Sequence, residues 1–387
     1  MLNASSICTA LLITILLIVP MSARPDSADS DAKRDIRPTM HAIFQALTTA
    51  LPISLDAQQF QSAKHRQSLH DALRDLAKNA ADLSQHGQHV PAGFDFLRQS
   101  LKQNARETLE LFEDGHFEEA RFVLQQLTDN CFLCHSRLPS SGDFSLGKRF
   151  LDQLPIDQLS PHERVRLAVA SRQFDTALST CEALFRSTDI PAAQIDLMAF
   201  FEDYMRIAIR VQSDFTRIIK TLETFRQRAD VPHYLGLHLS SWIQSLKTLQ
   251  ADTSHGDDLA HARALIETGQ RHNRFLADRQ GLVYFMQASS VLHRYVEAGS
   301  LSKPQFAEAY YLLGVAESYI QRSSWISETE TFLEAAVRVA PTSPFGKKAY
   351  AFLEEYVITG YSGSSGLHLP SDVQTRLDEL RRLLDTP

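Results

Sequence analysis

The chain has 387 residues, of which 44% are hydrophobic and 22% charged, and its formal net charge at pH 7 is −7. This length is enough for two domains, and the acidic balance argues against nucleic acid as a partner. The four cysteines, one of them in the predicted leader, are too few for a disulfide framework. Apolar residues recur at helical spacing along nearly the whole chain and rarely alternate with a period of two, which predicts an all-α fold.

Residues 1–23 have the features of a secretory signal peptide. Residues 7–19 form an apolar run, and the small residues Ser22 and Ala23 follow near a plausible cleavage point. The run is shorter than the roughly 20 apolar residues that span a bilayer. We therefore expect a mature chain without a transmembrane span, exported to the periplasm or another compartment outside the cytoplasm. Residues 24–35 are charged, lack an apolar pattern and predict a flexible arm.

Residues 36–139 carry four apolar stretches at helical spacing, separated by proline and glycine positions. The stretches begin near Ile36, Leu69, Phe94 and Phe117. Helices of this length with short connections pack as an antiparallel four-helix bundle, whose core is a common place for a cofactor. The fourth stretch continues through Cys131 and Cys134, so we expect both thiols on the inward face of that helix.

Residues 131–135 read Cys-Phe-Leu-Cys-His, the one segment whose residue types and spacing indicate a specific chemistry. Two thiols three positions apart can each add to a vinyl group of one haem, and the adjacent imidazole then reaches the iron, as in c-type cytochromes. A redox-active dithiol would require a βαβ context, and a structural zinc site would require a second pair of ligands. The sequence shows neither context, which favours one covalently attached haem c.

Four amphipathic helices with the haem motif near the end of the last one resemble the cytochrome c-prime, or class II, cytochromes. The resemblance covers residues 36–139. It implies that Cys131 and Cys134 bind the haem covalently and that His135 is the proximal iron ligand. It also implies that a residue of the first helix faces the other side of the haem. Met40 lies on the inward face of that helix and is the candidate distal ligand.

Other residues compete with Met40 for the distal position, because a methionine on an apolar helix face is more often core packing than a ligand. The histidines of this region are His41, His65, His70, His86, His89 and His116. His70 follows the inward Leu69 and is the strongest competitor, whereas His41 points about 100° away from Met40 around the helix. If none of these residues ligates the iron, it is five-coordinate and open to small gases such as nitric oxide or carbon monoxide.

Residues 140–159 begin with Ser-Ser-Gly-Asp and predict a linker. Residues 160–360 predict a series of helices that resembles the tetratricopeptide repeat, with about three extra residues between the two helices of the best match. The match is carried by Leu313, Gly314 and Tyr319 in one helix and by Leu333, Ala336 and Pro341 around the next. Such repeats stack into an α-solenoid that commonly binds a peptide or protein. The alternative is that these helices only cover the haem domain.

The remaining features are few. Cys181 lies on an apolar helix face, which favours core packing over a reactive thiol. Residues 361–387 predict a Ser/Gly-rich loop followed by a C-terminal capping helix. The sequence has no Gly-rich nucleotide-binding loop and no His-Glu-x-x-His metalloprotease pattern.

Together these features favour an exported c-type cytochrome that carries single electrons and is not an enzyme. Its repeat region would dock a redox partner protein. Two alternatives stay open. A five-coordinate haem would bind a diatomic gas and signal through the repeats. A peroxidase-type enzyme would need distal acid–base groups that the sequence does not nominate.

Overall fold

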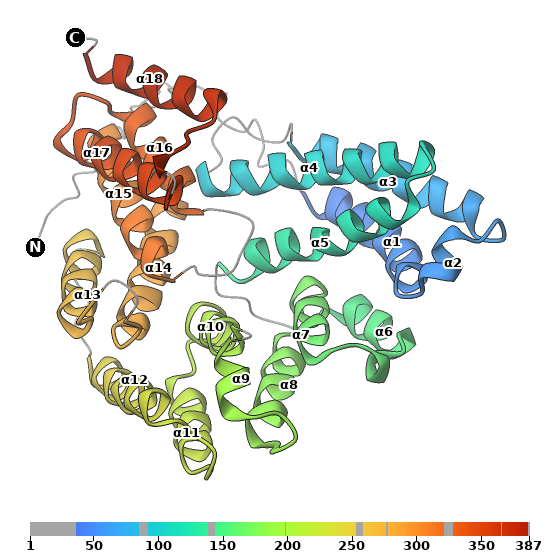
Figure 1. Cartoon of the computed structure of the whole chain (residues 1–387), viewed down its shortest axis with the longest axis horizontal. Coiled ribbons are helices and arrows are strands. Elements are labelled where there is room, and N and C mark those ends of the chain that lie inside the picture. Colours follow the sequence, from blue (N-terminus) through green and yellow to red (C-terminus); the bar gives the residue numbers. More distant parts are fainter. Residues whose placement is uncertain are drawn as a thin grey trace, which may run out of the picture.

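The structure of the protein is a computed structural model. It describes residues 36–84, 92–137, 144–197, 199–252, 258–275, 278–299, 301–320, 328–364 and 366–385. The leader predicted over residues 1–23 and the arm predicted over residues 24–35 lie outside these ranges. Within them the chain is helical apart from one hairpin of two short strands, so the prediction of an all-α fold is confirmed (Figure 1). None of the helices described there is long and apolar enough to cross a membrane.

The first five helices form the N-terminal group, drawn from blue to blue-green in Figure 1. They are α1 (Arg37–Ser54), α2 (Ala57–Gln61), α3 (Arg66–Ser84), α4 (Ala92–Glu113) and α5 (Phe117–His135). α1 packs against α3, α3 against α4 and α4 against α5. The backbone oxygen of Ser54 accepts hydrogen bonds from Arg121 and Gln125, near the start of α5. α1 and α5 therefore run in opposite directions, and the start of α1 lies at the same end of the group as the last turn of α5.

The N-terminal group is stabilised by apolar residues spaced three and four apart. In α3 the buried apolar residues include Leu69, Leu73, Leu76, Ala80 and Leu83, which lie on one face of the helix. Asp56 caps α2, because its carboxylate accepts hydrogen bonds from the backbone N–H groups of Gln58 and Gln59.

Within residues 140–159, where the sequence predicted a linker, the structure has α6 (Ser145–Gln153) and the short 3-10 helix η1 (Ile156–Gln158). α6 is stabilised by tertiary contacts, since the ring of Phe150 lies edge-on to that of Phe44 in α1, with ring centroids 5.5 Å apart. A helix this short has little stability of its own. This packing makes α6 a contact between the N-terminal group and the rest of the chain.

The remaining elements follow a curved path from green to red in Figure 1. They are α7 (Pro161–Ala170), α8 (Phe174–Arg186), α9 (Ala192–Leu197), α10 (Phe200–Met205), the π-helix η2 (Arg206–Gln212), α11 (Phe215–Arg226), α12 (His233–Ala251), α13 (Asp258–His272), α14 (Leu282–Glu297), α15 (Lys303–Ile320), α16 (Glu328–Val339), α17 (Pro344–Gly360), the strands β1 (Ser362–Gly363) and β2 (Gly366–Leu367), and α18 (Ser371–Asp385). Most helices pack against their neighbours in sequence. In addition, α5 packs against α7 and α4 against α16, so the N-terminal group bridges two distant parts of the curve.

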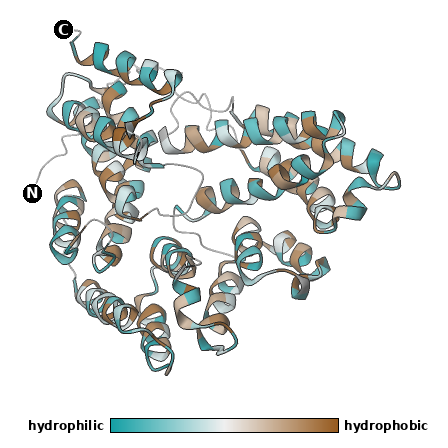
Figure 2. Cartoon of the chain, viewed as in Figure 1, coloured by the Kyte–Doolittle hydropathy of each residue, from teal (hydrophilic) through white to brown (hydrophobic). Residues whose placement is uncertain are grey.

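Apolar side chains fill the contacts between neighbouring helices, where Figure 2 shows the brown faces of many helices. The largest fully buried side chain is Trp242 in α12, whose indole N–H donates a hydrogen bond to the backbone oxygen of Arg279 at 2.6 Å. Cys181 in α8 is also fully buried, in agreement with core packing. The described part of the chain therefore has a continuous apolar core that runs along the curve.

The contact between α4 and α16 depends on a glycine. Gly93, in the first turn of α4, is buried, and a Cβ atom there would lie 2.6 Å from the ring of Phe332 in α16. The same Cβ would also overlap the guanidinium of Arg137. Only a residue without a side chain allows the two helices to come this close.

We expect Gly93→Ala to lower the free energy of unfolding by about 1–3 kcal/mol, because the added methyl group overpacks the contact with α16. Urea denaturation followed by circular dichroism measures the change. Gly360→Ala is the matched control, since a Cβ at Gly360 would have no atom within 4 Å, and its effect should stay below about 1 kcal/mol. Equal destabilisation by the two substitutions would contradict the steric explanation.

Candidate cofactor site

The three residues of the predicted haem motif lie in the last turn and a half of α5. Cys131, Cys134 and His135 are partly buried, and both cysteines pack against the apolar core. With 3.6 residues per turn, their side chains leave the helix within an arc of about 100°. α5 thus presents two thiols and one imidazole on a common face.

The imidazole of His135 is oriented by a backbone carbonyl of α7. Its Nδ1 lies 3.2 Å from the backbone oxygen of Val169, and the backbone of Ala170 also interacts with the ring. Burial lowers the pKa of His135 to about 4, so the ring is neutral at pH 7. A neutral imidazole that donates from Nδ1 to a carbonyl carries its lone pair on Nε2, the arrangement typical of a metal-ligating histidine.

The two thiols are protonated at neutral pH. Burial raises the pKa of Cys131 to about 12 and that of Cys134 to about 11, and the two cysteines form no disulfide. A redox-active dithiol requires a thiol pKa below the usual value, and zinc binds the thiolate. Across the described ranges, no three His, Cys, Asp or Glu side chains are arranged to hold a metal ion. The donor set therefore fits thioether attachment better than either of those alternatives.

The segment between the two cysteines is held against α7. The guanidinium carbon of Arg166 lies 4.4 Å from the ring centroid of Phe132, within the range of a cation–π contact. Arg166 also forms ion pairs with Asp129 of α5, at 2.7 Å, and with Asp203 of α10, at 3.5 Å. Through these contacts α7 and α10 fix the side of the motif opposite to α4.

The end of the motif is held by a second set of charges. Arg137 is buried and forms an ion pair with Glu328, the first residue of α16. Glu328 also pairs with Arg206 of η2, at 3.4 Å, and Arg206 is attracted by Asp203, three positions earlier. These contacts form a series of alternating charges. The series runs from Asp129, two residues before Cys131, to Arg137, two residues after His135. We call it the charge circuit; its members are Asp129, Arg166, Asp203, Arg206, Glu328 and Arg137.

Sequence reasoning missed the charge circuit. It assigned no role to Arg137 or to Glu328. One signal was present, because Arg206 and Arg210 interrupt an otherwise apolar stretch at a spacing of one turn. Both are buried in a π-helix, and Arg210 pairs with Glu317 of α15 at 2.6 Å. Arginines at such positions indicate buried ion pairs, although they do not identify the partners.

Met40, the candidate distal ligand, is partly buried in the first turn of α1 and packs against the core. It lies 14 residues before Ser54, a distance of about 21 Å along the helix. His135 lies 10 to 14 residues beyond the two residues of α5 that contact Ser54, or about 15–21 Å. Met40 and His135 therefore lie at similar heights at the same end of the N-terminal group, while His41 is exposed.

The structure argues against His65, His70 and His116 as iron ligands. His70 pairs with Glu113 at 2.9 Å, near the end of α4, and His116 immediately precedes α5. Because α5 extends 19 residues to His135, these side chains lie about 28 Å from the motif along the helix axis. His65 bonds to Gln59 at the same remote end. His86 and His89 fall outside the described residues. The proposed competitor His70 is thus wrongly placed for the site.

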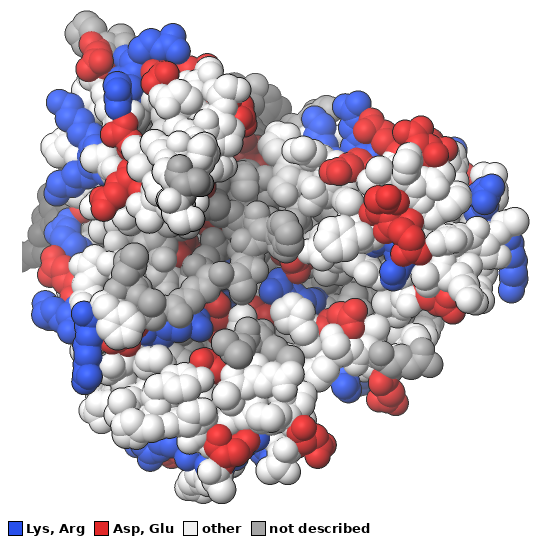
Figure 3. Space-filling view, viewed as in Figure 1, with Lys and Arg blue, Asp and Glu red and all other residues white. Residues whose placement is uncertain are grey.

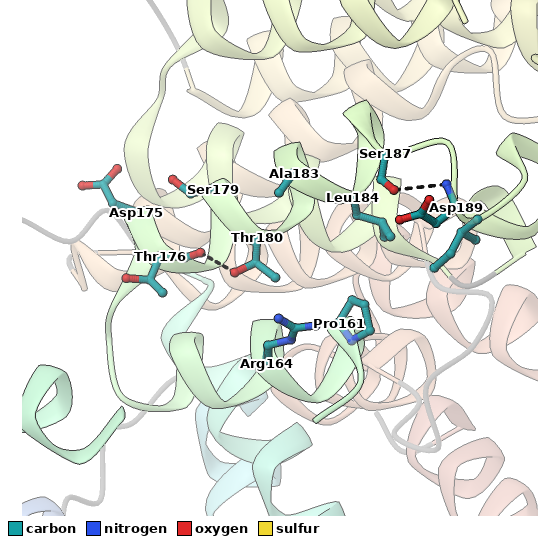
Figure 4. A pocket seen from close by; sticks show the side chains of 11 residues that line it. Pro161, Arg164, Asp175, Thr176, Ser179, Thr180, Ala183, Leu184, Ser187 and Asp189 are labelled. Carbon is teal, nitrogen blue, oxygen red and sulfur yellow. Dashed lines mark hydrogen bonds between the residues drawn. The ribbon is translucent and has the colours of Figure 1, made fainter. Parts of the chain in front are cut away.

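A groove of about 690 Å³ lies between α7 and α8 (Figure 4). It is lined by Pro161 and Arg164 of α7, by Ala183 and Leu184 of α8, and by Ile190 after α8. Its lining contains no cysteine or histidine. The groove is therefore separate from the donor set on α5.

No family model, curated protein or solved structure matches this chain. The assignment of the site therefore rests on its own residues and their geometry.

The protonation state of His135 makes a testable contribution to stability. Its pKa of about 4 in the folded chain lies below the usual value of 6.5. Between these two pH values the unfolded chain binds a proton that the folded chain does not, so stability falls as the pH is lowered through this window. The loss due to His135 is about 3 kcal/mol.

We expect the cofactor-free protein to lose about 3 kcal/mol more stability between about pH 7 and about pH 4 than its His135→Gln variant does. Urea unfolding at several pH values measures this difference. Since glutamine does not titrate, the same pH dependence in both proteins would show that His135 is not held neutral by burial.

Proposed function

We propose that the protein is an exported c-type cytochrome that transfers electrons through one haem c. Cys131 and Cys134 hold the haem covalently, and His135 is its proximal iron ligand. The observation that carries this proposal is the state of His135, a neutral imidazole whose Nδ1 donates to the backbone oxygen of Val169. Two protonated thiols share its face of α5.

The residues around the motif supply what a haem needs from its protein. When bound, the haem provides the one-electron chemistry. The thiols fix its edge, and the imidazole, oriented by α7, supplies the proximal nitrogen. Burial of the site and the identity of the distal ligand set the reduction potential.

The packing of the helices supports the finer fold assignment. We propose that α1, α3, α4 and α5 form a four-helix bundle of the cytochrome c-prime type and that residues 160–360 form a solenoid like the tetratricopeptide repeat. In the best match, a Cβ at Gly314 of α15 would lie 2.6 Å from Leu333 of α16. A small residue at this position lets the two helices of a repeat pack closely.

The solenoid is the proposed docking surface for a redox partner protein. On the face shown in Figure 3, Asp and Glu side chains are interspersed with Lys and Arg over both parts of the chain. The overall acidic balance of −7 favours a partner with a basic surface.

We expect the exported protein to carry one haem that remains bound after acid-acetone extraction. Intact-mass spectrometry and the extracted spectrum test this. The Cys131→Ala/Cys134→Ala double variant should lose all covalent haem, while the control Cys181→Ala should retain it, because Cys181 is buried in α8, a different helix from that of the motif. Haem that extracts freely from the wild-type protein, or no haem at all, would overturn the proposed function.

If Met40 is the distal ligand, the visible spectrum of the protein is low-spin. Met40→Leu keeps most of the side-chain volume but removes the sulfur, so we expect it to convert the spectrum to high-spin. His41→Ala, at the adjacent exposed position, is the control and should leave the spectrum unchanged. A high-spin wild-type protein that binds carbon monoxide would exclude ligation by Met40 and favour the gas-binding alternative.

A further inference from the structure

Arg137 is the feature that connects the motif to the far end of the chain. It follows His135 by two residues and is buried between two aromatic rings, those of Phe94 in α4 and Phe332 in α16. Its guanidinium carbon lies 5.3 Å and 5.5 Å from their centroids. Its charge is paired by Glu328. A buried arginine held in this way has little freedom to move.

Glu328 pairs with a second arginine as well. Its second carboxylate oxygen lies 3.4 Å from Arg206 of η2, so it links α16 both to the end of α5 and to the π-helix. The carboxylate and the guanidinium of Arg137 are each about 1% exposed. Because water does not screen charges at this depth, each of them acts on its surroundings over a longer range than a surface charge.

Both charges already act on the motif. Burial raises the pKa of the Cys134 thiol, Arg137 partly offsets that rise and Glu328 adds to it. The same field acts on any redox group attached at this thiol. A positive charge nearby favours the state with the added electron, and a negative charge opposes it.

We propose that Glu328 is a positioning residue of the haem site, through which α16 fixes Arg137 and sets the reduction potential of the haem. This inference rests on the proposed function. The C-terminal helices then form part of the redox site as well as the proposed docking surface. Any displacement of α16 that separates Glu328 from Arg137 would change the potential of a haem attached about 190 positions earlier in the sequence.

The test is the reduction potential of the full-length holoprotein, measured by spectroelectrochemistry. Glu328→Gln removes a negative charge and leaves Arg137 less compensated, so we expect the potential to rise. Arg137→Met removes the positive charge, so we expect the potential to fall. The Arg137→Met/Glu328→Met double variant changes no net charge, and its potential should lie between those of the two single variants.

A purely structural role would give a different pattern. Both single variants would then disturb the site in the same way, and their potentials would shift in the same direction or not at all, which would overturn the inference. If Glu328→Gln fails to fold, Arg137→Met and the double variant still decide the question, because the double variant should reverse the fall caused by the single one. Replacing both partners of a buried ion pair by apolar residues is usually tolerated.

Glu182→Gln is the matched control. Glu182 in α8 pairs with Arg217 at 2.6 Å, and α8 packs against α7, α10, α11 and η2. The reduction potential of the Glu182→Gln variant should equal that of the wild type. A shift as large as that caused by Glu328→Gln would overturn the specific role of Glu328. A wild-type protein without covalent haem would contradict the proposed function itself, whereas covalent haem with unaltered potentials in the variants contradicts only this inference.

Discussion

A buried guanidinium must be paired, and at Arg137 this requirement determines how the chain is arranged. Transfer of an unpaired charge from water into a protein interior costs several kcal/mol, and removal of one partner from a buried pair typically costs about 3–5 kcal/mol. The partner of Arg137 is Glu328, which lies 191 positions later. The helices between them therefore have to curve back to the end of α5. The contact of α4 with α16 and that of α5 with α7 follow from the same curvature.

Most helices could be predicted from the sequence, because their apolar spacing is a local property. The C-terminal helix predicted within residues 361–387, for example, is present as α18. Two local features had no such signal. Within the predicted series of helices, the chain is interrupted at Ala199, which has a positive φ of 59°, and α10 continues as the π-helix η2. α6 was missed because distant aromatic residues stabilise it and its own sequence does not.

The motif residues could be predicted from the sequence because the chemistry that they indicate depends on residue type and spacing. The residues that surround them could not be predicted. Val169 contributes a backbone oxygen, which any residue would offer, so its side chain carries no information. His70 shows a different limit, since periodicity gives the face of a helix on which a residue lies but not its height relative to another helix. That height became known only from the hydrogen bonds between Ser54 and α5.

The separation between Arg137 and Glu328 also imposes an order on folding. Contacts among α1, α3, α4 and α5 join neighbouring segments and can form early, whereas a contact across 191 residues requires closure of a very long loop. During synthesis the N-terminal helices emerge first and α16 among the last. We therefore expect an interval in which α5 is already helical while Arg137, just beyond its C-terminal end, has not yet paired with Glu328. For the proposed cytochrome, this interval is the time at which the two thiols are most accessible to haem attachment, and formation of the Arg137–Glu328 ion pair ends it.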